Sequence, residues 1–588
     1  MRCTHHVLIL FGLLGLAVLV QVLVIGRAVV PSLDSVRYVK AAQAVEREGV
    51  LQAIRTDGQQ PLFPVWVAVV HRAIVSWAGD VPSSWAVAVQ TAAVVPLVLA
   101  VVPIYLLLIR LFRSGIAVVG SILFCALPEV RRLSADGLSD SLHLLFFTAA
   151  LGAAVAYWTS LSRNRAWWLA AAGLLTGLAL LARAEAIILP VAIVLSLVIA
   201  YVKKPSRLKN PSRDREGAVV AHDTPIPLPH GRGSDFEWTP RAAVVAVAGH
   251  GVGLLLVLVP YVLMAGDHTP GAAVARVLGR AAAEAPPPSN VQVAPLPNET
   301  PDGRPLRFLA KEGSIRRRGI AAAVGQYADE LVVVFGYWAG VVALWTLWRR
   351  RRELARPVDR FMELFFVLFS ITVIAFVSRE GYLSARHLLP LLVTGLGVTA
   401  VGLCDIGTLL SMNRGRAPRL GVCAIMTLII AVYLISATRP LRADRLAHRQ
   451  AGAWLAQQSN KNTAVLDTRG WTALYSARPT YLYDKAKTAL GDGRLGYIVI
   501  EPKELTFDTD RARTLGWLLE TAGERAARFA GSGENSMDEV AVYRWRGERL
   551  HAGKKGISPI CRNGPKGALH KLDLSPFFRA LQAKGNQP

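Results

Sequence analysis

Long apolar runs separated by short polar loops dominate this chain. Eleven such runs occur, and the first is long enough to cross the ~30 Å hydrocarbon layer of a membrane at ~1.5 Å per residue. The runs lie at 7–30, 85–109, 115–130, 141–159, 166–182, 185–202, 241–265, 328–348, 361–378, 388–410 and 420–437. This pattern predicts an all-α polytopic membrane protein with about 11 transmembrane helices.

The apolar segment 61–78 differs from these runs. Its length would nearly span a membrane, but His71 and Arg72 lie in its middle. An unpaired charge at the bilayer centre costs at least ~2.5–3.5 kcal/mol. The pattern therefore predicts that this segment is re-entrant or lies at the interface.

Basic residues gather in five loops between the runs. If 61–78 does not cross the membrane, all five loops face the cytoplasm, as the positive-inside rule requires; if it crosses, all five face outward. These loops are 110–113, 162–165, the stretch that begins at Lys203, 349–352 and 414–419. We therefore expect the segments 31–84 and 266–327, and the tail 438–588, to lie on the outer side.

The hydrophobic pattern also predicts the organisation outside the membrane. Residues 203–240 are rich in Pro, Arg, Gly and Ser and are expected to form a disordered cytoplasmic insert. In the tail 438–588, strand-like segments alternate with helical ones, which predicts a small exoplasmic α/β domain after a membrane module of residues 1–437. The expected strands are 463–467, 496–500 and 539–545, and the expected helices are 446–455 and 515–530. This domain could be a lid, an acceptor-recognition module or a structural appendage.

The composition agrees with this prediction. Of the 588 residues, 53% are hydrophobic and 18% charged, and the mean hydropathy is +0.37, which excludes a disordered chain. A net charge of +25 in a soluble protein would suggest nucleic-acid binding, but the loop positions of the basic residues are explained by membrane orientation, so no nucleic-acid partner is expected. The five cysteines form no CxxC pair, which argues against a cysteine zinc site.

A single acid follows the first run. Asp34 stands at the outer mouth of that span, and Arg37 and Tyr38 follow it on an expected helix as candidate substrate-binding residues. The carboxylate could accept a proton from an acceptor hydroxyl or amine, or anchor a divalent cation beside a leaving phosphate. Alternatively, Asp34 could serve as the N-cap of that helix.

Further charged residues fall in the other expected outer loops. Asp136 and Asp140 are candidate catalytic acids, although Asp140 could merely cap the next span. Arg183 and Glu185 lie in a tight turn between two apolar runs, where ionisable groups are functional candidates, although a simple interfacial ion pair would look the same.

The last outer loop combines cations with a tyrosine. Arg386 and His387 could hold a phosphate, because a guanidinium pairs with phosphate in a bidentate way. Arg379 and Tyr382 precede them and complete the candidate substrate-binding residues of this loop, although the loop could also be an interfacial anchor.

Charged clusters that reach one membrane face favour an enzyme acting on a lipid whose headgroup is presented there. A transporter or flippase would place charges near mid-bilayer, within broken helices of repeated halves, and neither feature is evident. A membrane scaffold that presents the tail domain is the other alternative.

Five motifs, in this order, resemble the GT-C glycosyltransferases of the protein O-mannosyltransferase and aminoarabinose-transferase type. The resemblance covers residues 7 to about 437. The motifs are Asp34, Gln60-Pro61-Leu62-Phe63-Pro64, Pro128 with Ser134 and Asp136, the span from Gly173 to Arg183, and Tyr382-Leu383-Ser384-Ala385-Arg386-His387.

The resemblance implies a GT-C-like fold and transfer of a hexose or pentose from a polyprenyl-phosphate carrier to a protein, lipid or glycan acceptor. It implies that the reaction takes place on the exoplasmic side of a bacterial inner membrane. Asp34 would be the base or metal anchor, and Arg386 would neutralise the carrier phosphate. Two positions depart from the family pattern: Ser35 replaces a second acid, and Gln60 replaces a histidine. A divalent cation therefore stays open as a cofactor.

Overall fold

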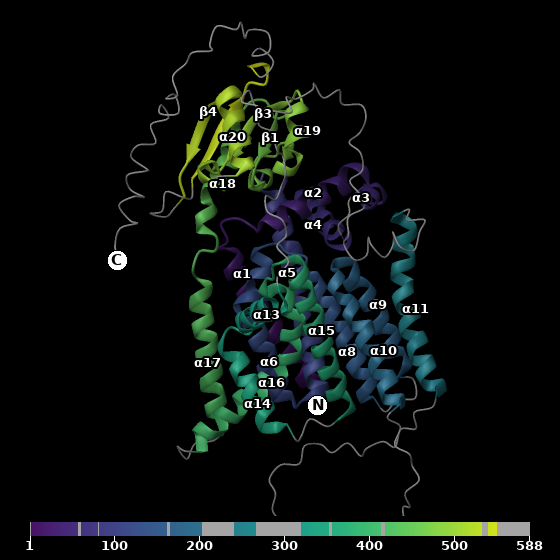
Figure 1. Cartoon of the computed structure of the whole chain (residues 1–588). Coiled ribbons are helices and arrows are strands. Elements are labelled where there is room, and N and C mark those ends of the chain that lie inside the picture. Colours follow the sequence, from purple (N-terminus) through teal and green to yellow (C-terminus); the bar gives the residue numbers. More distant parts are fainter. Residues whose placement is uncertain are drawn as a thin grey trace, which may run out of the picture.

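The computed structural model describes residues 2–56, 60–79, 81–160, 165–202, 240–265, 319–351, 356–412, 418–507, 509–531 and 539–549. The described chain forms a helical bundle with a small α/β domain over one end (Figure 1). The N-terminus lies at the opposite end of the bundle (Figure 1). We call the end that carries the α/β domain the domain end.

The bundle helices follow the predicted apolar runs. Among the described residues, seven helices are long and apolar enough to cross a membrane, or eight if one bent pair counts as a single span, so the chain is an integral membrane protein. The helices are α1 (Arg2–Ile25), α5 (Ser84–Leu111), α6 (Ser114–Ala126), α7 (Pro128–Ala135), α8 (Asp140–Thr159), α9 (Ala166–Ala182), α10 (Ile188–Val202), α11 (Pro240–Ala265), α13 (Ile320–Val334), α14 (Trp338–Arg350), α15 (Pro357–Glu380), α16 (Leu389–Met412) and α17 (Pro418–Ala437). The predicted polytopic helical fold is confirmed, with α6, α9 and α17 as shorter apolar helices.

One predicted span is not straight. The run 328–348 is divided between α13 and α14, whose axes meet at 101°. Between them, Gly336 and Tyr337 have φ values of 61° and 68°, which no helix can contain. Helix α13 also begins at Ile320, inside the predicted outer loop 266–327. The rest of that loop (266–318) and all but the last residue of the predicted insert 203–240 lie outside the described residues.

Helices α9 and α11 pack backbone against backbone. A Cβ atom added at Gly173 would lie 2.0 Å from the carbonyl oxygen of His250, and one added at Gly253 would lie 2.1 Å from that of Ala170. Glycine at both positions therefore permits an approach that any side chain would block.

Three shorter helices lie next to the α/β domain at the domain end (Figure 1). They are α2 (Leu33–Glu48), α3 (Val50–Thr56) and α4 (Leu62–Ala78). The polar residue in the middle of α4, His71, is buried and lies 3.0 Å from both Glu46 Oε1 and Ser84 Oγ. These contacts explain how the apolar helix tolerates a ring that would be costly in lipid.

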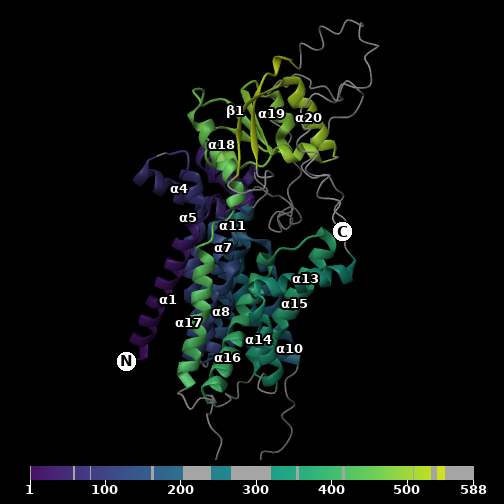
Figure 2. The ribbon, with the colours of Figure 1, turned by 90° about the vertical axis from the view of Figure 1, so that its left-hand side faces the viewer.

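The α/β domain follows α17, which leads directly into it (Figure 2). Its sheet has the order β2-β1-β3-β5-β4, with the first three strands parallel and β5 antiparallel to both β3 and β4. Helix α18 packs on one face, and α19 and α20 pack on the other. The elements are η3 (Ala443–Arg445), α18 (Leu446–Gln457), β1 (Ala464–Asp467), η4 (Trp471–Leu474), β2 (Thr480–Tyr481), α19 (Ala486–Gly491), β3 (Leu495–Ile500), α20 (Asp510–Ala522), β4 (Gly523–Phe529) and β5 (Val540–Trp545).

The predicted elements of this domain are confirmed except for one. Strands form at all three predicted places, but the predicted helix 515–530 ends at Ala522. The next residues form β4, which is held by backbone pairing with β5. Gly523 disfavours continuation of the helix, and the pairing with β5 then decides the structure of a segment without β-branched residues.

Candidate active site

Asp34 lies in the first turn of α2, where its carboxylate is not used as a cap. Ser32 is the N-cap, and its side chain accepts a hydrogen bond from the backbone N–H of Ser35. The Asp34 carboxylate instead pairs with a guanidinium from a distant loop: its Oδ2 lies 2.6 Å from Nη1 of Arg386. The structure therefore brings the first and last predicted outer loops together at one point.

The Asp34 side chain is 35% exposed and that of Arg386 is 24% exposed, so the pair stands at a partly open mouth. Burial by itself would raise the pKa of Asp34. The positive charge of Arg386, with smaller contributions from Arg37 and Arg183, outweighs burial and lowers the pKa of this carboxyl. Asp34 is therefore held in its ionised form.

A second ion-pair cluster lies deeper, where three helix ends meet. Asp140 is the first residue of α8, Arg183 follows the last residue of α9, and Glu185 belongs to the short 3₁₀ helix η1 (Ala184–Ile187). Nη1 of Arg183 is 2.7 Å from Asp140 Oδ2, and Nη2 is 2.7 Å from Glu185 Oε1. Asp140 is nearly fully buried. Removal of any one partner would leave a buried charge without compensation, so the cluster is a structural part of the site.

A pocket connects the two clusters. Carboxylates, guanidinium groups and imidazoles line one part, and aliphatic side chains line the rest. The lining residues are Asp140, His143, Leu144, Arg183, Glu185, Arg386, His387, Leu389 and Pro390. Arg386 and His387 reach it from the 3₁₀ helix η2 (Ala385–Leu388), which precedes α16. The Nε of Arg386 is buried and makes no hydrogen bond within the described chain, so this donor remains for a ligand.

His143 is a pocket residue that the sequence analysis missed. Its Nδ1 lies 3.3 Å from the carbonyl oxygen of Ala179, which can only accept, so Nδ1 carries the proton and Nε2 presents a lone pair. That Nε2 is buried without a hydrogen-bond partner in the described part of the chain. The spacing from Asp140 to His143 (i, i+3) places both on one helix face and was the signal that could have identified it.

Three other predicted residues belong to α2 or to the segment just before α4. The hydroxyl of Tyr38 is 2.7 Å from Ser139 Oγ, immediately before α8. Arg37 is exposed, and Gln60 is half-buried just before α4.

The remaining predicted residues are not among those that line the pocket. Asp136 pairs with Arg442, whose Nε is 2.7 Å from Asp136 Oδ1. Arg379 is largely exposed and faces Glu380 at 3.5 Å. Tyr382 packs its ring against that of His387, with centroids 6.3 Å apart, at the edge of the pocket.

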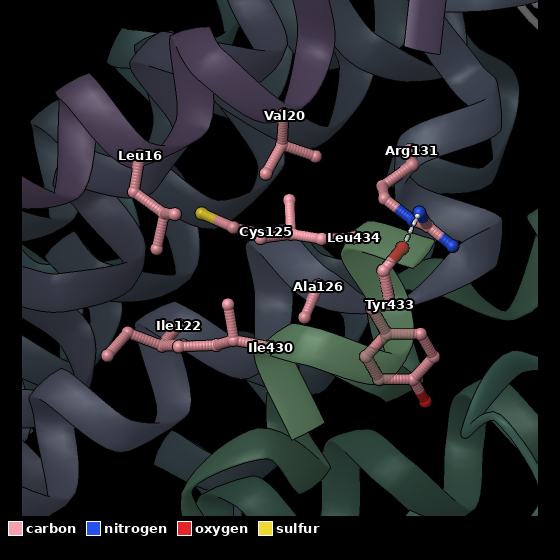
Figure 3. A pocket seen from close by; sticks show the side chains of 9 residues that line it. All are labelled: Leu16, Val20, Ile122, Cys125, Ala126, Arg131, Ile430, Tyr433 and Leu434. Atoms are coloured by element: carbon pink, nitrogen blue, oxygen red, sulfur yellow. Dashed lines mark hydrogen bonds between the residues drawn. The ribbon is translucent and has the colours of Figure 1, made fainter. Parts of the chain in front are cut away.

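A second pocket lies between α1, α6 and α17 (Figure 3). It is lined by aliphatic side chains, Cys125, Tyr433 and the buried Arg131. Nη1 of Arg131 donates to the carbonyl oxygen of Tyr433 at 2.7 Å, in the last turn of α17. A cation at a helix C-terminus is stabilising, so this arginine holds α7 to α17.

The donors at the candidate site do not fit a divalent cation. Among the described residues, no group of three or more histidine, cysteine, aspartate or glutamate side chains is arranged to hold a metal ion. Both Asp34 and Asp140 face a guanidinium at 2.6–2.7 Å, so a cation would have to displace an arginine. No step below passes through a metal.

The helical bundle, the helices beside the domain and the capping α/β domain define a polytopic membrane protein with the GT-C fold. The fold matches that of ArnT from Cupriavidus metallidurans in the apo state, with a TM-score of 0.57, 13% identity and coverage of 93% of this chain and 99% of that one. The same enzyme bound to undecaprenyl phosphate gives a TM-score of 0.57 and 13% identity, covering 90% of this chain and 97% of that one.

Residues 59–221 match the family model of dolichyl-phosphate-mannose-protein mannosyltransferase. The Archaeoglobus fulgidus oligosaccharyltransferase gives a TM-score of 0.46 at 12% identity and covers 89% of this chain and 74% of that one. No curated protein matches the sequence. The GT-C resemblance expected from the five motifs is confirmed.

Proposed function

We propose that this chain is a membrane glycosyltransferase that moves a sugar from a polyprenyl-phosphate-linked donor to an acceptor. The observation that carries the proposal is the Asp34–Arg386 pair, 2.6 Å apart, whose arginine lines a pocket of mostly ionisable side chains with Leu144, Leu389 and Pro390 beside them. A lipid-phosphate sugar needs these groups together: a cation for the phosphate, a base for the acceptor and an apolar surface beside them.

In the proposed step, the acceptor hydroxyl or amine attacks C1 of the sugar while its proton passes to the Asp34 carboxylate. The bond between C1 and the phosphate oxygen breaks, and the lipid phosphate leaves with the bonding electrons. Arg386 holds the charge that develops on that phosphate, and its buried Nε is a donor that no described residue of the protein uses. When the phosphate takes the guanidinium, Asp34 loses its partner and gains basicity for the acceptor.

The substrate class follows from three lines of support. The Cupriavidus enzyme with the same fold binds undecaprenyl phosphate, and the matched family model is that of a lipid-phosphate mannosyltransferase. The transferred unit is a hexose or pentose, and the acceptor is a protein, lipid or glycan. The basic loops of the sequence support a site and an α/β domain on the exoplasmic side of the membrane, for which we propose a bacterial inner membrane.

The test is transfer from a panel of undecaprenyl-phosphate sugars in proteoliposomes, with Asp34→Asn compared with Glu48→Gln. Glu48 is an exposed acid at the far end of the same helix. Loss of the base lowers turnover by about 10²–10⁴-fold in Asp34→Asn, and Glu48→Gln retains wild-type turnover. Full transfer by Asp34→Asn would remove this residue from the mechanism. Substrate-dependent uptake without transfer would assign the protein to transport.

A further inference from the structure

The turn that carries Asp34 is held by hydrogen bonds to Asp136, at the end of α7, and by contacts with the α/β domain. We propose that Arg442 is a positioning residue: through Asp136 it fixes the N-terminus of α2 and so sets the position of the Asp34 carboxylate. The inference deepens the proposed function and rests on it for the role of Asp34. It also assigns a task to the α/β domain.

One carbonyl oxygen anchors the start of α2. The backbone N–H of Ser32 donates to the carbonyl oxygen of Asp136 at 3.1 Å, and the Ser32 hydroxyl donates to the same oxygen at 2.9 Å. The Ser35 hydroxyl is a third donor to it. Two of these donors flank Asp34 in the sequence, so a displacement of Asp136 moves the catalytic turn.

The backbone after this carbonyl is shaped for the contact. Gly137 has a φ of +63°, a conformation that side chains disfavour, and a Cβ there would lie 3.1 Å from Ser35 Oγ. A glycine at this position lets α7 end directly against the first turn of α2.

The carboxylate of Asp136 connects the anchor to the α/β domain. Its Oδ1 accepts a hydrogen bond of 2.7 Å from Nε of Arg442, in the segment between α17 and η3. Arg442 has a φ of +57°, a left-handed conformation that is unusual for a residue with a side chain. The neighbouring residue Leu441 exchanges backbone hydrogen bonds with the chain just before Asp34: its N–H donates to Arg27, and its carbonyl accepts from Val29.

The α/β domain itself also contacts the turn that carries Asp34. The indole Nε1 of Trp471, in η4, donates to the carbonyl oxygen of Pro31 at 3.1 Å. Nζ of Lys40 donates to the carbonyl oxygen of Thr480 at 2.7 Å. Trp471 and Leu474 also belong to one apolar core with residues of α2, α4 and α5. The α/β domain and the segment that leads into it therefore contact residues 27–40 both before and after Asp34.

The experiment compares four full-length proteins in proteoliposomes: wild type, Arg442→Gln, Arg439→Gln, and the charge swap Asp136→Arg with Arg442→Asp. Arg439 is exposed on the same connecting segment, so its variant loses the same charge without touching the anchor. A misplaced base slows the chemical step more than binding, so Arg442→Gln lowers kcat by about 10–100-fold and leaves KM for the lipid donor within about twofold. Arg439→Gln matches the wild type. The swap restores most of the lost kcat, because it rebuilds the pair.

Hydrogen exchange of residues 27–40 gives a readout that needs no substrate. Exchange there rises in Arg442→Gln and stays at the wild-type level in Arg439→Gln. Wild-type kcat together with wild-type exchange in Arg442→Gln would overturn the positioning role. A charge swap as slow as the single variant would assign Asp136 to the chemistry instead. Full activity of Asp34→Asn would refute the proposed function, whereas the exchange data would still decide whether Arg442 holds the turn.

Discussion

Replacing Arg386 by glutamine tests the phosphate-binding half of the proposed site. The guanidinium has one donor on Asp34 and a buried Nε that makes no hydrogen bond to any described residue, so two donors can meet a phosphate. Hydrogen bonds to charged groups contribute about 1.5–3 kcal/mol each. The ion pair between Arg386 and Asp34 must break before the phosphate binds, and because it is partly exposed it contributes only about 0–1 kcal/mol. The net contribution is therefore about 2–6 kcal/mol, which predicts a loss of about 30-fold or more in kcat/KM.

The same variant predicts a change in pH dependence. Arg386 lowers the pKa of Asp34 against the opposing effect of burial, so its removal raises that pKa. If Asp34 is the base that we propose, activity is lost as the pH falls through its pKa. The acid limb of the pH–rate profile therefore moves to higher pH in Arg386→Gln.

The assay is initial-rate transfer from a fixed undecaprenyl-phosphate sugar over a pH series. Arg132→Gln is the matched control, since Arg132 is a largely exposed arginine that faces Glu129 on α7. An acid limb that stays in place, or a rate loss equal to that of Arg132→Gln, would refute the assignment of Arg386 to the phosphate.

Three further predictions concern the scaffold. Gly173→Ala places a methyl group against the His250 carbonyl and lowers stability by about 1–3 kcal/mol in thermal unfolding, whereas Gly12→Ala, which meets nothing within 4 Å, does not. The pKa of Glu501 falls from its ordinary 4.5 to about 2 despite burial, because His448, Arg469 and Arg445 stabilise the carboxylate. The stabilisation of the α/β domain by this carboxylate is therefore present above about pH 4.5 and is lost as the pH falls toward about 2. Hydrogen exchange of the domain measures this loss, and Glu501→Gln removes the pH dependence. Burial lowers the pKa of Lys40 from 10.5 to about 8, so the free energy of unfolding rises between these pH values, and Lys40→Met abolishes that rise in melts across the range.

The sequence predicted those parts of the molecule that depend on local hydrophobicity. Long apolar runs must become helices in lipid, because every backbone polar group needs a partner within the segment. Asp34 and Arg386 were expected on one membrane face, because the basic loops put both of their segments on the outer side, and the structure brings the two side chains into contact. Their roles, like those of the other site residues, stay predictions.

What the sequence did not show depends on backbone geometry or on distant partners. Hydropathy is insensitive to the two positive φ angles at Gly336 and Tyr337 that divide one predicted span. The helical composition around Arg525 gave no indication of β4, which exists because β5 offers an edge. The contact between Asp136 and Arg442 joins residues 306 positions apart, and no local pattern reveals such a pair.

The place of β5 in the sheet has a consequence for biosynthesis. This strand, the last described one along the chain, lies between β3 and β4, so the sheet cannot close until residues 540–545 have been made. The domain that it completes contacts residues 27–40, which are synthesised long before residues 540–545. The turn that carries Asp34 therefore lacks the support of a completed domain until β5 has been made. A premature stop before β5 would leave the described membrane helices in place and this turn without that support.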